Sequence, residues 1–226
     1  MRRTPVVTVL EIGSETPETP ETEARLEALL PEGTRRRLSA FTHRARRRQS
    51  LWGRLLALAE SRSLGAELIE EPPYPPYLRK DEGQLALSIA HTGRFVALGT
   101  ASFADQVMGI DLETVRPMRR LEDVSRMSLG AAAEVTVAAC RRSGSYDPFF
   151  LAWGMMEAEV KLNRGGARYR LIAEGERPAV IGDDGSPLLV TYEALDALRL
   201  TVLTSTLKPV VRRLTSDDLT AQLLQH

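Results

Sequence analysis

The spacing of apolar residues changes repeatedly along this chain between a helical and a strand-like pattern, and this alternation restricts the possible folds more than any other feature. A helix is predicted at residues 44–62, but the proline-rich segment 71–77 cannot continue it, because proline lacks an amide hydrogen and clashes with the preceding turn. Further helices are predicted at 21–30, 119–142, 147–162 and 215–225, and strands at 5–12, 84–90, 94–101, 106–113, 168–173, 178–181, 187–191 and 197–204. We therefore expect an α+β protein with two halves of similar size, divided into lobes 1–105 and 106–226.

Composition excludes several classes of partner. The chain carries 30 basic and 30 acidic side chains, so no net charge draws it to nucleic acid or to a membrane surface. No apolar run reaches the roughly 20 residues that cross a bilayer, and the short apolar stretch after the first two arginines lacks the features of a signal peptide. The single cysteine, Cys140, cannot form an internal disulfide. We expect a cytoplasmic monomer without membrane or nucleic-acid partners.

A basic run between residues 35 and 54 stands out from this even balance. Its members are Arg35, Arg36, Arg37, Arg44, Arg46, Arg47, Arg48 and Arg54. Such a run forms either a solvated helix face or a site for phosphate or an acidic partner, and the sequence pattern leaves both open.

Two carboxylates follow each other on the strand predicted at residues 106–113. Side chains alternate between the faces of a strand, so Asp111 and Glu113 share one face, and the apolar residues Met108, Ile110 and Leu112 share the other. Neighbouring carboxylates repel each other unless a cation lies between them, and magnesium prefers oxygen ligands completed by water and phosphate. The pattern therefore indicates either a magnesium site or two ordinary acids on a solvent-facing strand.

A third acid lies on the helix predicted at 147–162. Trp153, Glu157 and Lys161 are spaced four residues apart and so share one stripe of that helix. A surface Glu–Lys pair would explain the spacing, but the apolar residues before it indicate a buried helix, in which an acid needs a partner. His91 is predicted to lie in a turn after a strand, and by itself it is either a structural or a functional residue.

Three segments resemble, in order and spacing, the 4′-phosphopantetheinyl transferases of the type that activates surfactin synthetase. That family reads approximately N-I-S-H-S-G-x-W-V, then G-I-D-I-E, then F-x-x-x-W-x-x-K-E-A-x-x-K. The corresponding segments here are SIAHTGRFV at 88–96, GIDLE at 109–113 and the stretch from Phe149 to Lys161, with Trp153, Glu157 and Ala158 in register. The match is clear over residues 88–165.

This resemblance implies both a fold and a chemistry. The family folds as two similar α+β lobes with a pseudo-twofold relation, and coenzyme A lies in the cleft between them. The family reaction moves phosphopantetheine from coenzyme A to a serine of an apo acyl or peptidyl carrier protein, and it depends on magnesium. By register with the family motifs, the magnesium ligands would be Asp111, Glu113 and Glu157. Glu157 would also deprotonate the serine, and Lys161 would stabilise charge on the phosphates.

The resemblance also implies contacts with both substrates. Candidate contacts with the 3′-phosphate of coenzyme A are Arg37, Arg48, Ser50 and His91. Carrier proteins of this class are acidic, so the arginines that follow the acidic strand form either a docking patch for the carrier or a solvated face. These arginines are Arg116, Arg119, Arg120 and Arg126.

Three positions depart from the family pattern. Met156 replaces a lysine before Glu157, the segment 75–77 replaces a Gly-Lys-Pro, and Ala90 replaces a serine before His91. Each change removes a polar or cationic group expected near the nucleotide. An alternative function follows, namely a catalytically impaired homologue of the same fold that binds a carrier protein or a nucleotide.

Overall fold

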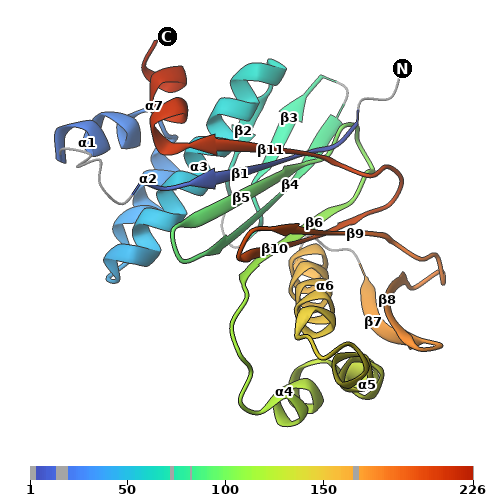
Figure 1. Ribbon diagram of the computed structural model, residues 1–226. Helices are drawn as coiled ribbons and strands as arrows, with labels where there is room; N and C mark the ends of the chain where they lie inside the picture. The colour runs from blue at the N-terminus through green and yellow to red at the C-terminus, as the bar shows by residue number, and fades with distance from the viewer. Residues whose placement is uncertain (1–3, 14–19, 72–73, 82, 165–167, 226) are drawn as a thin grey trace. The chain divides into compact units, whose positions relative to one another are not determined.

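The computed structural model describes residues 4–13, 20–71, 74–81, 83–164 and 168–225 (Figure 1). Helices and strands both contribute, and the strands form several sheets, so the predicted α+β class is confirmed. Contacts divide the chain into a first unit, Met1–Asp105 with Val210–His226, and a second unit, Gln106–Pro209. A pseudo-twofold similarity of the two halves stays a prediction. None of the described helices combines the length and apolar character that crossing a bilayer requires.

The first unit is built on a six-stranded sheet with the order β11-β1-β5-β4-β3-β2. Its strands are β1 (Val6–Glu11), β2 (Glu67–Ile69), β3 (Tyr77–Lys80), β4 (Gly83–Thr92), β5 (Phe95–Thr100) and β11 (Val210–Thr215). Neighbouring strands are antiparallel except β1 and β11, which run parallel. The sequence pattern located β1, β4 and β5, whereas β2, β3 and β11 are too short or too polar to show it.

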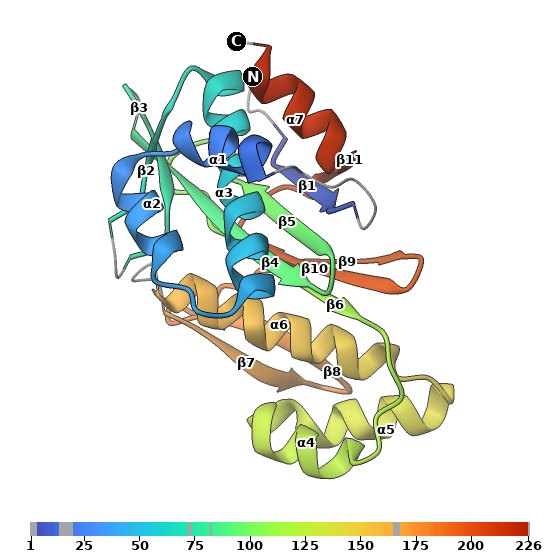
Figure 2. The ribbon, with the colours of Figure 1, turned by 90° about the vertical axis from the view of Figure 1, so that its left-hand side faces the viewer.

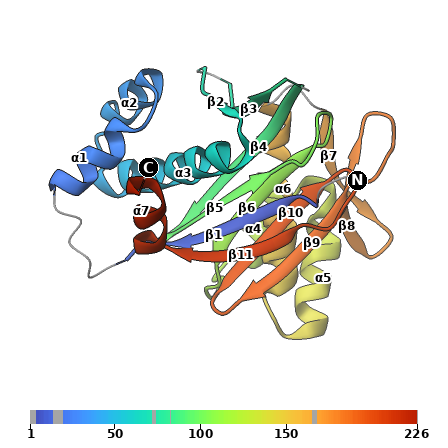
Figure 3. The same ribbon diagram turned by 90° about the horizontal axis from the view of Figure 1, so that it is seen from above.

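Helices of the first unit cover the sheet and close its core. Those in the described residues are α1 (Pro20–Ala28), α2 (Glu32–Ser39), α3 (Arg44–Leu64) and α7 (Ser216–Leu224). The longest, α3, packs on β4 and β5 with α7 beside it (Figures 2 and 3). Leu51, Trp52 and Leu55 of α3 are fully buried in the apolar core of this unit. The helix ends at Gly65, whose positive φ of 58° suits glycine at a helix terminus.

The C-terminal segment belongs to the first unit. β11 pairs with the whole of β1, from Val6 opposite Val210 to Glu11 opposite Thr215. α7 then begins with a capping box between Thr215 and Asp218, which satisfies backbone amides at the helix start. The sequence-based lobe 106–226 differs from this arrangement at its end, because residues 210–215 hydrogen-bond to the edge of β1 that would otherwise stay unpaired.

The second unit contains a three-stranded antiparallel sheet, β6-β10-β9, and a separate hairpin, β7–β8. Its elements are β6 (Met108–Thr114), α4 (Leu121–Ser128), α5 (Ala133–Ser143), α6 (Asp147–Arg164), β7 (Tyr169–Glu174), β8 (Arg177–Gly182), β9 (Leu189–Leu195) and β10 (Leu198–Thr204). The single helix predicted at 119–142 is interrupted, because Gly130 adopts a positive φ of 50° between α4 and α5. α6 packs on β6 and β10 and also contacts α5 and β7 (Figure 1).

Two glycines allow α6 to approach this sheet closely. A Cβ atom at Gly154 of α6 would lie 2.2 Å from Thr201 Oγ1 of β10. A Cβ atom at Gly109 of β6 would lie 2.8 Å from the carbonyl oxygen of Ala158 in α6. Both distances are far below van der Waals contact, so a side chain at either position would force the helix and the sheet apart.

We expect Gly154→Ala to lower the free energy of unfolding by about 1–3 kcal/mol, because the new methyl group must displace Thr201 or α6. Gly33→Ala is the matched control, since Gly33 also lies in a helix but a Cβ there meets no atom closer than 3.8 Å. Alanine favours a helix over glycine, so this control should be neutral or stabilising. Urea denaturation followed by circular dichroism measures both variants. Equal stabilities would contradict the close helix–sheet contact.

Candidate functional site

Asp111 and Glu113 of β6 lie on the face of the sheet that α6 covers. Gly109, two residues earlier on the same face, is the residue that approaches Ala158 of α6. Asp111 is only 6% exposed, and Glu113 is half-buried. The alternative of two ordinary acids on a solvent-facing strand does not fit this burial.

Lys161 of α6 reaches the same strand. Its Nζ lies 2.9 Å from Asp111 Oδ1 and donates a second hydrogen bond of 2.9 Å to the carbonyl oxygen of Ile110. A buried carboxylate requires a partner of this kind, because removing an isolated charge from water is costly. A place for Lys161 beside the substrate phosphates, which the family resemblance implies, stays a prediction, and the structure shows that Lys161 pairs with Asp111.

The second oxygen of Asp111 is left without a partner. Oδ2 is buried and accepts no hydrogen bond from any described residue. Nearly all buried polar atoms in folded proteins are satisfied by protein groups, ordered water or ions. Asp111 Oδ2 is therefore the atom of this site at which a cation, or a water bound to one, would fit.

Glu113 and Glu157 add negative charge beside Asp111. Trp153 Nε1 donates a hydrogen bond of 3.1 Å to Glu113 Oε1, a role that the sequence analysis did not assign to this tryptophan. Burial raises the pKa of the Glu113 carboxyl, and the charges of Asp111 and Glu157 raise it further, whereas the Trp153 hydrogen bond and Arg116 lower it. The part of this rise that comes from Asp111 and Glu157 is repulsion between ionised carboxylates, which a cation would relieve.

This donor set suits a hard divalent cation. The part of the chain that the structure describes contains no group of three His, Cys, Asp or Glu side chains already gathered to hold a metal. Magnesium does not require such a group, because it is commonly bound through one or two carboxylates, with waters and substrate phosphates as the other ligands. Asp111 and Glu113 fit that role, and Glu157 is close enough to influence the charge of Glu113.

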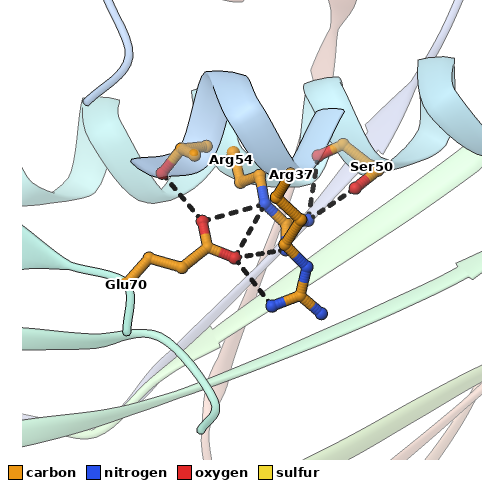
Figure 4. Close-up of polar contacts among 5 residues, drawn as sticks. Arg37, Ser50, Arg54 and Glu70 are labelled. Carbon is orange, nitrogen blue, oxygen red and sulfur yellow. Dashed lines mark hydrogen bonds and ion pairs between the residues drawn. The ribbon is translucent and has the colours of Figure 1, made fainter. Parts of the chain in front are cut away.

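Two of the predicted coenzyme A contacts, Arg37 and Ser50, are hydrogen-bonded in the first unit to a buried ion pair between Arg54 and Glu70 (Figure 4). The side chain of Glu70 is only 1% exposed, and its carboxylate accepts hydrogen bonds from Arg54 Nε at 3.0 Å and from Arg37 Nη1 at 3.2 Å. Arg54 also donates to the Ser50 hydroxyl at 2.7 Å. Thr34 completes the arrangement by donating to Glu70 at 2.8 Å.

Nothing in the local sequence distinguishes Glu70, and Arg54 is only one member of the basic run between residues 35 and 54. The two residues are 16 positions apart, and a strand separates them, so no helical or strand spacing links them. The one available signal was the four-residue spacing of Ser50 and Arg54 on α3, which places them on one stripe.

Arg48, the third candidate, lies where α3 meets the sheet. Its Nη2 donates to the carbonyl oxygen of Gly13, just after β1, at 3.3 Å. The next residue, Gln49, donates through Nε2 to the carbonyl oxygen of Gly93 at 2.8 Å. The first half of α3 is therefore fastened to the end of β1 and to the turn between β4 and β5.

His91, the fourth candidate, lies close to that turn but not in it. It belongs to β4 and pairs with Val96 of β5, and the turn itself consists of Gly93 and Arg94. The predicted position of His91 in a turn is wrong, because the ladder between β4 and β5 continues to the last residue before Gly93. Arg48 is next to Gln49 in the chain and His91 is two residues before Gly93, so both candidates lie near the hydrogen bond between Gln49 and Gly93.

We expect Glu70→Gln to lower the free energy of unfolding by about 3–5 kcal/mol, because Arg54 would keep a buried charge without a counterion. Glu67→Gln is the matched control. Glu67 pairs with Arg79 on the surface, where both side chains are more than half exposed, and its loss should leave stability nearly unchanged. Denaturant unfolding measures both. A similar cost for the two variants would contradict a buried role for Glu70.

Comparison with known proteins adds no relative to this picture. No protein-family model matches the chain, and a search of curated proteins finds no match. The functional interpretation therefore depends on the carboxylates of β6 and α6, on the arginine cluster of α3, and on the three motifs that contain them.

Proposed function

We propose that this protein transfers 4′-phosphopantetheine from coenzyme A to a serine hydroxyl of an apo acyl or peptidyl carrier protein, with magnesium as cofactor. The observation that carries the proposal is the buried, unpartnered Oδ2 of Asp111, which lies on the same strand face as Glu113 and under the helix of Glu157 and Lys161. Oxygen donors around a buried atom that lacks a partner are what a magnesium–phosphate complex requires.

Asp111, Glu113 and Glu157 would hold the magnesium ion. When bound, the ion would neutralise charge on the coenzyme A pyrophosphate and so favour attack at phosphorus. Transfer of this kind depends on positioning and charge neutralisation more than on covalent help from the protein. The chain therefore needs a base for the serine and cations for the leaving group.

Glu157 is the proposed general base. It would accept the proton of the carrier serine as the serine oxygen bonds to the phosphorus of the pantetheine phosphate. The bond from that phosphorus to the bridging oxygen breaks, and 3′,5′-ADP leaves with the electron pair. The half-buried carboxylate of Glu157 makes no hydrogen bond or ion pair with another described residue. It is therefore able to accept the proton of the serine.

Lys161 and Trp153 are proposed to prepare the site. The Lys161 ammonium compensates the charge of Asp111 before substrate arrives, and it can turn a proton toward a phosphate oxygen when the pyrophosphate binds. Trp153 fixes one oxygen of Glu113 through its indole N–H, which leaves the other oxygen for the cation. Second contacts of this kind orient carboxylates for metal binding.

Arg37, Arg48, Ser50 and His91 are the proposed contacts of the 3′-phosphate. Glu70 and Arg54 hold Arg37 and Ser50 in place, and the Arg37 side chain remains 39% exposed, so its guanidinium is accessible to a ligand. The exposed arginines after β6 suit an acidic carrier protein through charge complementarity. They are Arg116, Arg119, Arg120 and Arg126.

We expect Glu157→Gln to reduce the transfer rate by about 10²–10⁴-fold, the usual contribution of a general base, and Asp111→Asn to reduce it at least as much through loss of the metal. Mass spectrometry of an apo carrier protein incubated with coenzyme A, magnesium and each variant measures the mass gain of phosphopantetheine. Glu174→Gln is the matched control, because Glu174 is an exposed acid of the same unit and should keep full activity.

Two outcomes would contradict this assignment. Full activity of either variant would show that the carboxylates do not bind the metal. Failure of the unchanged protein to modify several apo carriers, while an active transferase succeeds under the same conditions, would exclude transfer. Carrier or nucleotide binding without transfer would then favour the catalytically impaired binding protein that Met156, Ala90 and the segment 75–77 suggest.

A further inference from the structure

α6 presents a second face, distinct from the one that carries Glu157. Asp147, Leu151 and Met155 are spaced four residues apart and form a stripe about 120° around the helix from the stripe of Glu157 and Lys161, at about 100° per residue. The stripe of Asp147, Leu151 and Met155 lines a cavity of about 570 Å³ that α5, β8 and β9 complete. This cavity lies within the second unit and shares no lining residue with the carboxylate site.

The walls of this cavity are mainly apolar. Its apolar lining comes from each of the surrounding elements and consists of Ala139, Pro148, Leu151, Met155, Pro178 and Val190. Small-molecule sites are typically concave, apolar spaces of about 300–1,000 Å³ with a few polar groups at defined places. The volume and the lining therefore suit a compact apolar ligand rather than a nucleotide.

The polar and charged residues that line the cavity determine which polar end group of a ligand can bind there. Asp147 accepts a hydrogen bond of 2.6 Å from Arg199 Nε, and that guanidinium lowers the pKa of the Asp147 carboxyl. Tyr192 donates its hydroxyl to the carbonyl oxygen of Asp147 at 3.2 Å. Burial, then the charge of Asp147, raises the pKa of Tyr192, so this phenol stays neutral.

Two further charged residues line the cavity, Glu176 in the turn before β8 and Arg177 at the first position of β8. Glu176 pairs with Arg142 at 3.5 Å, so its charge is compensated. The side chain of Arg177, in contrast, is exposed and makes no hydrogen bond or ion pair with any other residue that the structure describes, although it lines the cavity. Among the charged residues that line the cavity, the Arg177 guanidinium is thus the one without an ion-pair partner among the described residues.

We propose that this cavity binds a monocarboxylate with an apolar body, such as a medium-chain fatty acid. The apolar chain lies against Leu151, Met155 and Val190, and the carboxylate pairs with the guanidinium of Arg177. Arginine suits this role because its planar fork donates two parallel hydrogen bonds to a carboxylate. A ligand with an ammonium group would be repelled by Arg177, and a neutral alcohol would leave its charge unpaired. This binding is independent of phosphopantetheine transfer.

Titration calorimetry with decanoate, decanol and decylamine, each below the concentration at which it aggregates, tests the ligand class. We expect decanoate to bind with one-to-one stoichiometry and to bind at least tenfold more tightly than the other two. Arg177→Gln should weaken decanoate binding about tenfold, the effect of removing a hydrogen bond to a charged group. Arg170→Gln is the matched control, since Arg170 is an exposed arginine of the same hairpin that does not line the cavity, and it should leave binding unchanged.

Methyl-labelled methionine locates the ligand. Decanoate should shift the NMR signal of Met155, which is buried in the cavity wall, and leave the signal of Met127, which is 87% exposed, unchanged. Ala139→Phe should block the cavity and abolish binding. If that variant does not fold, Arg177→Gln and the Met155 signal still decide the matter. Equal binding of decanoate and decanol, tighter binding of decylamine, no binding at all, or a shift of Met127 alone would overturn the proposal.

Discussion

The close contact of α6 with β6 and β10 is the constraint on which the second unit depends. Gly154 brings the helix against Thr201, and Gly109 lets the strand pass beneath the backbone of Ala158. With a side chain at either position, Lys161 would stand farther from Asp111, and the buried ion pair would lengthen. Coulomb energy falls with distance and rises in a low-dielectric interior, so small changes in helix height weigh heavily on these charges.

Buried charges are paired in both units, but in different ways. In the first unit, Glu70 is shared between Arg54 and Arg37, and both of its carboxylate oxygens accept hydrogen bonds (Figure 4). In the second unit, Asp111 has one oxygen paired with Lys161 and one without a partner. A fully satisfied cluster rigidifies a core, whereas an incompletely satisfied one retains the capacity to bind something. This difference separates the satisfied carboxylate of Glu70, which holds neighbouring side chains in place, from the incompletely satisfied carboxylate of Asp111, which can bind a cation.

Much of the fold and part of the site were predictable from local pattern. The helices α3 and α6 and the strands β4, β5 and β6 follow from runs of apolar residues with the appropriate period, and the shared face of Asp111 and Glu113 follows from strand geometry alone. Gly130 was visible in the sequence, but only its positive φ showed that α4 and α5 are separate helices. The place of His91 in β4 likewise depended on how far a strand ladder extends, which the sequence does not state.

The sequence by itself determined which chemical groups the chain carries and on which side of each element they lie, because the periods of helix and strand are properties of the local backbone. Three carboxylates, one lysine and a tryptophan were recognisable in this way. Only the tertiary structure decided which of these groups meet: that Lys161 pairs with Asp111, that Trp153 donates to Glu113, that Glu70 holds Arg54 and Arg37, and that residues 210–215 return to β1. Such partners are distant in the chain, and their pairing is set by which surfaces pack together once water is excluded, a property that no local spacing contains.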